Sequence, residues 1–170
     1  LAVIVARQVP TGEHPLPSAV VSAVRKVLLA HGPITNECTG LAFRFPNVIA
    51  RPAGVVQLTG ANRNLVRRTF PWLYEDLEDW APCWVVVEGG AAVSVCFTSR
   101  LGTNAAEAGV ETLPAFRHCG YAAATSAAWG TTVREQSHIP LYSTALENVA
   151  SQAVARRLGL VQFGVDTTWT

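Results

Sequence analysis

The residues between 105 and 134 constrain this chain most strongly, because they predict a strand, a sharp turn and a helix in direct succession. Ala105–Leu113 carries β-compatible residues in near alternation, and Pro114 ends the strand because proline has no N–H to give to a sheet. Arg117–Ala122 then leads into an alanine-rich helical run that reaches about Arg134. A helix with mostly small inner residues can lie close against the sheet that contains the strand.

The turn at Arg117–Ala122 has the features of a phosphate site. The first N–H groups of a helix have no partner within the helix, and the helix dipole adds partial positive charge at the same end. Gly120 lets the backbone approach a ligand closely, and Ala122 leaves room at the next contact. The alternative is an ordinary strand-to-helix turn that binds nothing.

These residues resemble the acetyl-CoA-binding motif of the GNAT superfamily of N-acyltransferases, Gln/Arg-x-x-Gly-x-Gly/Ala directly after a strand. Arg117, Gly120 and Ala122 stand at its three fixed positions. Residues 148–160 are similar to a second family signature, Asn-x-x-Ser/Ala followed by Leu-Gly-Phe. The chain also resembles the subgroup with Glu-x-Gly-x-x-Thr before these motifs, which Glu107, Gly109 and Thr112 match. The likeness covers about residues 82–170.

The resemblance implies an α/β (α+β) fold in which a mixed central sheet, flanked by helices, splays at the cofactor site. We expect one GNAT-like domain over residues 1–170, with a divergent substrate-side half at 1–81 and an acetyl-CoA-binding core at 82–170. Hydrophobic periodicity, caps and turns predict elements in the same order as the family core. The expected strands are 1–6, 55–58, 84–87, 91–98, 105–113, 139–143 and 160–169, the expected helices 18–30, 62–70, 71–80, 121–135 and 147–158, and the rest of 41–59 is expected to be irregular.

Acetyl-CoA is the co-substrate that the resemblance implies. The residues that it places against acetyl-CoA are Thr112, Leu113, Arg117, His118, Cys119, Gly120, Tyr121, Ala122, Asn148 and Ser151. Two positions depart from the family pattern. Cys119 stands where the family often has Lys or Arg, and Ala155 stands where many members carry a tyrosine that acts as general acid. Asn148 has a second interpretation, because asparagine is also a good helix N-cap.

An amine must lose a proton before it attacks a thioester, so an acetyltransferase needs a base. Glu107 and Glu111 lie four residues apart in one strand and therefore project from the same face. A carboxylate in a central strand is costly unless it is hydrogen-bonded or functional, so both are candidate bases. The alternative is a polar strand end that faces solvent. Tyr142 is the candidate general acid for the leaving thiolate, and the alternatives are Ser143, water or departure of the thiolate without an acid.

An acidic cluster at Glu75–Asp79 lies between large aromatic residues: Trp72 and Tyr74 come before it and Trp80 comes after it. Aromatic faces beside carboxylates suit a cationic amine, so this cluster is a candidate wall of the acceptor site. The alternative is that the aromatics belong to the core and the acids form a solvated helix face.

The overall composition excludes several classes of partner. A net charge of +1 gives no electrostatic case for nucleic acid or an anionic membrane, and no apolar run reaches the length of a membrane span. Four cysteines without CxxC or Cys/His spacing predict no metal site and favour reduced thiols in the cytoplasm. The chain has no methionine, even at position 1, so we expect its native start to be missing. A homodimer is left open.

The resemblance thus implies an acetyl-CoA-dependent N-acetyltransferase that transfers an acetyl group directly to a primary amine of a small molecule or protein. One alternative is a non-catalytic acyl-CoA-binding or regulatory module on the same fold, which the departures at Cys119 and Ala155 support. Another is a small α/β domain that binds only protein partners. Binding of CoA separates the last from the other two, and turnover with an amine panel separates the first from the second.

Overall fold

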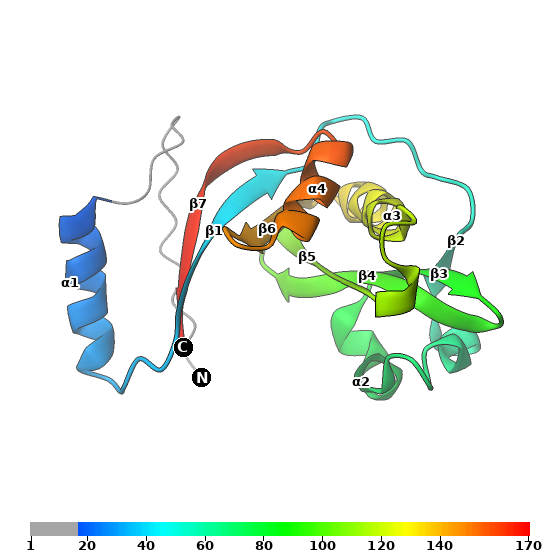
Figure 1. The fold of residues 1–170 in the computed structure, drawn as a ribbon, viewed down its shortest axis with the longest axis horizontal. Coiled ribbons are helices and arrows are strands. Elements are labelled where there is room, and N and C mark those ends of the chain that lie inside the picture. Colours follow the sequence, from blue (N-terminus) through cyan, green and yellow to red (C-terminus); the bar gives the residue numbers. More distant parts are fainter. Residues whose placement is uncertain (1–16) are drawn as a thin grey trace.

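A single mixed sheet of seven strands organises the computed structural model, which describes residues 17–170 (Figure 1). The strand order is β2-β3-β4-β5-β6-β1-β7, and every neighbouring pair is antiparallel except β5 and β6. The strands are β1 (Glu37–Arg44), β2 (Val55–Leu58), β3 (Cys83–Glu88), β4 (Ala91–Leu101), β5 (Ala105–Thr112), β6 (Ile139–Ala145) and β7 (Val161–Trp169). The mixed sheet flanked by helices is confirmed, and the strand expected over residues 1–6 lies outside the described residues.

Helices cover both faces of this sheet. Figure 1 shows α3 and α4 on one face, α2 on the other, and α1 standing apart beyond β7. The α-helices are α1 (Ser18–Leu29), α2 (Pro71–Glu75), α3 (Tyr121–Glu135) and α4 (Val149–Arg157), and short 3₁₀ helices occupy Gly60–Leu65, Leu77–Trp80 and Pro114–Phe116. The predicted helix 62–70 is wrong, because Thr59 caps the 3₁₀ helix and its N–H donates to the Asn62 side chain at 2.7 Å.

β1 is a strand that the sequence analysis assigned largely to irregular chain because of Pro46 and Pro52. Pro46 lies beyond the last residue of the strand and therefore removes no hydrogen bond from it. Glycine is a poor strand former, which hides the strand further, but Gly40 is required here. A Cβ at Gly40 would lie 2.4 Å from the carbonyl oxygen of Thr144 on β6. β1 is central to the sheet, since it pairs with both β6 and β7.

The long helix α3 is fixed on the sheet by apolar packing and by two buried indole hydrogen bonds. Trp129 is fully buried and its Nε1 donates to Thr98 of β4 at 3.1 Å. Trp84 of β3 donates in the reverse direction, to Thr132 of α3 at 3.0 Å. The buried face of α3 is rich in alanine, serine and threonine, as the sequence predicted, so the helix axis can lie close to the strands.

A second apolar cluster fills the opposite face of the sheet, under α2 and the 3₁₀ helix that follows it. Phe70, just before α2, and the helical residues Leu73 and Leu77 are buried in it, and they pack against Val85 and Val95 of the sheet. This cluster lies under β2, β3 and β4 only. Within residues 17–170, no helix has both the length and the apolar character needed to span a membrane.

The two buried cysteines lead to a prediction about thiol reactivity. Burial raises the pKa of the Cys83 thiol to about 12 and that of Cys96 well above its ordinary value, whereas Cys38 and Cys119 are exposed. A thiol is reactive as the thiolate. We therefore expect two of four thiols to react quickly with Ellman's reagent at pH 8 and two to react only after unfolding. Rapid reaction of three or four thiols in the native protein would contradict this burial.

The same shifts predict how stability depends on pH. A thiol with a raised pKa in the folded state contributes stability that is complete below its ordinary pKa of 9.0 and is lost as the pH rises toward 12. We expect the free energy of unfolding in urea to fall by about 1.4 kcal/mol per pH unit for each such thiol above pH 9. A Cys83→Ala variant should show a shallower decline than the parent chain.

Candidate active site

The parallel ladder between β5 and β6 is short, and the site lies where it stops. Three residue pairs form it, the last being Glu107 with Leu141. Beyond that pair β5 remains bonded to β4 and β6 remains bonded to β1, so the two strands separate. The gap holds a cavity of about 420 Å³ between Ala108–Val110 and Tyr142–Ala145. The sheet therefore has an opening between its two central strands.

Glu107 lies at the last paired position, beside this opening. It is only 8% exposed, and its Oε1 accepts a hydrogen bond from Ser143 Oγ at 2.5 Å. Its Oε2 lies 3.4 Å from Nη1 of Arg100. A buried carboxylate is tolerated when it is paired and hydrogen-bonded in this way. Glu111 projects from the same face but is exposed, so the solvent-facing alternative holds for Glu111 and not for Glu107.

A second carboxylate, Asp166 on β7, adjoins Glu107 on the same face of the sheet. Its Oδ2 lies 3.9 Å from Nη1 of Arg100, so one arginine lies between two acids. A small cavity of about 20 Å³ is bounded by Glu107, Ser143 and Asp166. The sequence analysis missed both Arg100 and Asp166. No local pattern marks them, because only the pairing of Gly40 with Asp166 across β1 brings β7 to this place.

Tyr142 lies on the opposite side of the opening, toward α4. Its hydroxyl is 2.6 Å from the Ser151 hydroxyl, and both residues line the large cavity. Burial raises the pKa of Tyr142 above its ordinary value, with the Ser151 hydrogen bond opposing the shift, so the phenol keeps its proton at neutral pH. Ala155, at the position of the family tyrosine, is completely buried in the core.

The predicted turn between β5 and α3 has a special backbone. His118 and Gly120 both have positive φ angles, 65° and 81°. Ala122 is half-buried in the first turn of the helix. Arg117 donates from Nε to the Thr112 carbonyl at 3.4 Å, which ties the turn to the end of β5. The left-handed conformation at position 120 favours glycine over any residue with a Cβ.

Arg157 of α4 covers this turn and is a third residue that the sequence analysis overlooked, after Arg100 and Asp166. A Cβ at Gly120 would meet its guanidinium at 3.0 to 3.1 Å, so the guanidinium lies directly over the glycine. Arg157 is exposed to solvent. It brings positive charge to the turn in which Cys119 replaces the usual cation. The signal in the sequence was the basic pair before Leu158-Gly159, which was read only as part of a signature.

The end of β5 offers backbone donors to the opening. Leu113 is not one of them, because its N–H donates to Val93 of β4 at 2.9 Å. N–H groups alternate in direction along a strand, so those of Val110 and Thr112 point away from β4 and toward the gap. The Thr112 hydroxyl is 2.8 Å from Ser94 on β4.

The remaining predicted residues are Tyr121, Cys119 and Asn148, of which only Asn148 lines the large cavity. Tyr121 donates its hydroxyl proton to Glu88 at 2.7 Å. Cys119 is exposed and bonds weakly to the Arg117 carbonyl, with a sulfur-to-oxygen distance of 3.6 Å. Asn148 lines the cavity and caps α4, its side-chain oxygen accepting from the Ser151 N–H at 3.0 Å. The capping interpretation of Asn148 is therefore correct.

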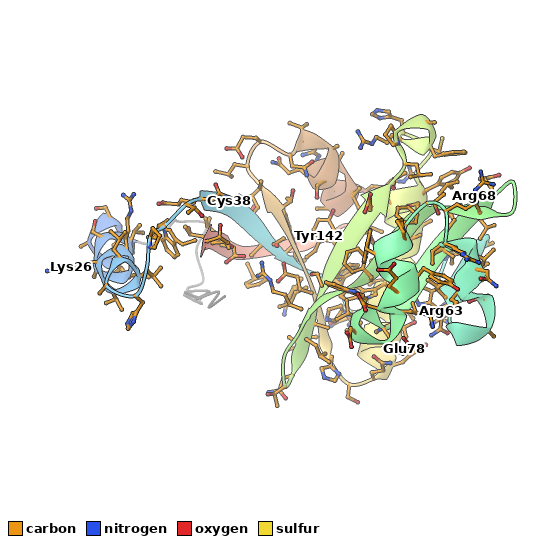
Figure 2. All side chains as sticks on the ribbon, turned by 90° about the horizontal axis from the view of Figure 1, so that it is seen from below. Lys26, Cys38, Arg63, Arg68, Glu78 and Tyr142 are labelled. Carbon is orange, nitrogen blue, oxygen red and sulfur yellow. The ribbon has the colours of Figure 1, made fainter. Side chains whose placement is uncertain are left out.

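The acidic cluster at Glu75–Asp79 lies away from the opening and lines neither cavity. Figure 2 shows Glu78 and Arg63 toward one end of the molecule, whereas Tyr142 lies near the middle and Cys38 lies toward the other end, which carries Lys26. The acids of the cluster are exposed, and Glu78 lies 3.8 Å from Arg63. Trp72 and Trp80 pack edge-to-face with Phe97, whose ring lies on Gly109, where a Cβ would approach within 2.4 Å. The structure therefore agrees with the alternative in which the aromatic residues pack against the core and the acids are solvated.

The turn before α3 can accept an anionic group, and the opening can admit an extended chain. Gly120 presents bare backbone at the N-terminus of α3, the guanidinium of Arg157 lies over it, and Arg117 belongs to the same turn. The opening beyond it is polar along both strand edges. No group of three or more His, Cys, Asp or Glu side chains in the described part of the chain is placed to hold a metal ion.

Comparisons with known proteins agree with this arrangement. The sequence model of the GNAT acetyltransferase family matches residues 68–165. A comparison with curated proteins finds no match. Solved structures share the fold at low identity, so they bear on the fold alone. A GNAT-family acetyltransferase structure from Novosphingobium aromaticivorans has a TM-score of 0.66 at 18% identity, with 81% of this chain and 65% of that chain covered.

Two further structures extend the comparison. A GCN5-related N-acetyltransferase-like protein from Streptococcus suis has a TM-score of 0.62 at 15% identity, over 91% of this chain and 69% of that one. An aminoglycoside N-acetyltransferase solved in complex with CoA has a TM-score of 0.52 at 19% identity, over 64% of this chain and 92% of that one. The chain spans less than two thirds of the length of the Novosphingobium protein.

Proposed function

The chain belongs to the GNAT acetyltransferase family, a family of acyltransferases, and from that membership we propose that it transfers an acetyl group from acetyl-CoA to a primary amine. One observation carries the proposal. The sheet opens between β5 and β6, and a buried carboxylate, Glu107, lies at the point where it opens. A thioester and an amine that approach from opposite faces can meet only at such an opening.

The turn before α3 is the proposed seat of the CoA pyrophosphate. Backbone N–H groups at the start of α3 and the guanidinium groups of Arg117 and Arg157 supply donors and positive charge. When bound, acetyl-CoA supplies an acetyl group already activated as a thioester. The other proposed contacts to acetyl-CoA are the predicted residues within 112–122, together with Asn148 and Ser151, which line the large cavity.

Glu107 is the proposed base. Its carboxylate is shielded from solvent and faces the opening, so it can take a proton from the acceptor's ammonium group, directly or through one water. The neutral amine can then form a carbon–nitrogen bond as the carbon–sulfur bond breaks. The N–H groups of Val110 and Thr112 are placed to stabilise negative charge on the carbonyl oxygen. Most of the remaining rate enhancement comes from holding the two reactants together.

Tyr142 is the proposed proton donor to the leaving sulfur. It lines the same cavity, and its raised pKa keeps a proton on the hydroxyl at neutral pH. It comes from β6, whereas the family tyrosine would come from α4, where this chain has the buried Ala155. The absence of the α4 tyrosine favours a second candidate function, a CoA-binding module without catalysis. Binding of CoA without any turnover of acetyl-CoA would support this second candidate.

The proposed cofactor site can be tested by measuring CoA binding. Arg157→Gln should weaken CoA binding about fivefold, the loss expected for one exposed charge-assisted contact of ~1 kcal/mol. Isothermal titration calorimetry against CoA measures this, with Arg156→Gln as the matched control on the neighbouring position. The same loss with dephospho-CoA would assign the contact to the pyrophosphate. Equal affinities for Arg157→Gln and the parent chain would remove Arg157 from the site.

Gly120→Ala tests the backbone of the same turn. A Cβ at this positive φ costs about 1–2 kcal/mol of backbone strain and also displaces the Arg157 guanidinium. We expect a lower melting temperature together with a loss of CoA affinity larger than that of Arg157→Gln. A variant that is less stable but binds CoA normally would show that the turn is not the pyrophosphate site.

The proposed base can be tested by substitution of Glu107. Glu107→Gln keeps the shape of the side chain and its acceptor for Ser143 but removes its basicity. The rate of acetyl transfer near neutral pH should fall by roughly 10²-fold or more, with CoA affinity little changed. Glu111→Gln, on the same strand face but exposed, is the control and should retain activity. The reverse result would assign the base to Glu111.

A further inference from the structure

We propose that Asp166 binds the positively charged amine of the acceptor, a role that deepens the proposed acetyl transfer and rests on it. Asp166 comes from β7, outside every motif in the sequence, and it lines both cavities at the opening of the sheet. Its place is on the face opposite α4, so an acceptor held there approaches from the side away from Tyr142 and Ser151.

One oxygen of this carboxylate has no hydrogen-bond partner among residues 17–170. Asp166 Oδ1 is buried and makes no hydrogen bond within the described residues, while Oδ2 faces Arg100 at 3.9 Å. The side chain as a whole is 14% exposed. Native structures rarely leave a buried charged oxygen unsatisfied, and such an atom calls for a donor that the structure does not contain. A ligand ammonium group is a donor of the right charge.

The charges around Asp166 favour a cation over an anion. The group contains two carboxylates, Glu107 and Asp166, and one guanidinium, Arg100, which lies within 4 Å of both acids. Its sum is one negative charge, in a place where low solvent exposure strengthens electrostatic interactions. Because Arg100 is already engaged by the two acids, a carboxylate on the acceptor has no free cation there to bind.

The space available also fits an ammonium head. The small cavity of about 20 Å³ is bounded by Asp166, Glu107 and Ser143, and it is large enough for one water-sized group. An amine bound to Asp166 in this cavity lies beside the proposed base, Glu107. The acceptor class is therefore a primary amine that is positively charged in solution. A free diamine and a lysine side chain share this chemistry.

Asp166→Asn tests the proposal, because it keeps the size of the side chain and removes the charge. The probes are 1,5-diaminopentane and a short lysine-containing peptide, each titrated calorimetrically into the CoA-bound protein and each used as acceptor with acetyl-CoA. For whichever probe binds, we expect its affinity to fall about tenfold or more and its KM to rise by a similar factor. The turnover number and the CoA affinity should change less than threefold. Glu147→Gln, an exposed carboxylate at the start of α4, is the charge-matched control and should behave like the parent chain.

The outcomes separate this proposal from the proposed function. If the parent chain binds an amine probe and Asp166→Asn binds it equally well, the role of Asp166 is overturned, whatever the turnover. If binding depends on Asp166 but no amine is acetylated, the acceptor site stands and the proposed transfer fails. Binding of neither probe by the parent chain would also overturn the role of Asp166. A larger effect on the diamine or on the peptide identifies which source of amine the site takes.

Discussion

The early end of the β5–β6 ladder is the constraint on which the rest of this site depends. Each of these strands keeps one hydrogen-bonded neighbour, β4 or β1, and loses the other after Glu107 and Leu141. The inner strand edges then present N–H and C=O groups that water or a ligand must satisfy. A ligand with amide groups of its own, such as the pantetheine arm of CoA, can replace the missing strand pairing. The fold thus leaves an opening at the centre of its sheet, where a ligand could complete the hydrogen bonding.

The polar groups around the opening support one another. A carboxylate as buried as Glu107 is stable only because Ser143 donates to it and Arg100 lies next to it. Arg100 in turn lies between Glu107 and Asp166, so the position of either acid depends on the other. Such a network holds Glu107, the proposed base, in place without a ligand, and fixed groups need no reorganisation during a reaction.

Local features of the sequence predicted most of the fold, because they act over a few residues. The Gly-Gly turn between β3 and β4, Pro114 after β5 and Asn148 before α4 each specify a boundary by their own chemistry. The buried position of Glu107 followed from its place in a central strand. β1 and the role of Asp166 were missed because neither is specified by local features of the sequence.

Neither feature is encoded locally. Gly40 looks like a strand breaker until the Thr144 backbone is seen against it, and Asp166 acquires its meaning only from the register across β1. Arg157 was likewise visible as a residue but not as a neighbour of Gly120. The sequence therefore marked the turn and the candidate base, and tertiary pairing was needed to find the charged residues that lie beside them.

The position of β1 has a consequence for how the chain is made. Gly40 pairs with Ala145, which the ribosome adds 105 residues later. At about 5–20 residues per second, β1 waits on the order of 5–20 s for its first ladder partner. During that time it is an unpaired strand edge, the kind of segment that other chains can join. Biosynthesis of this protein therefore includes an interval in which an interior strand of the sheet has been made before either of the strands that pair with it.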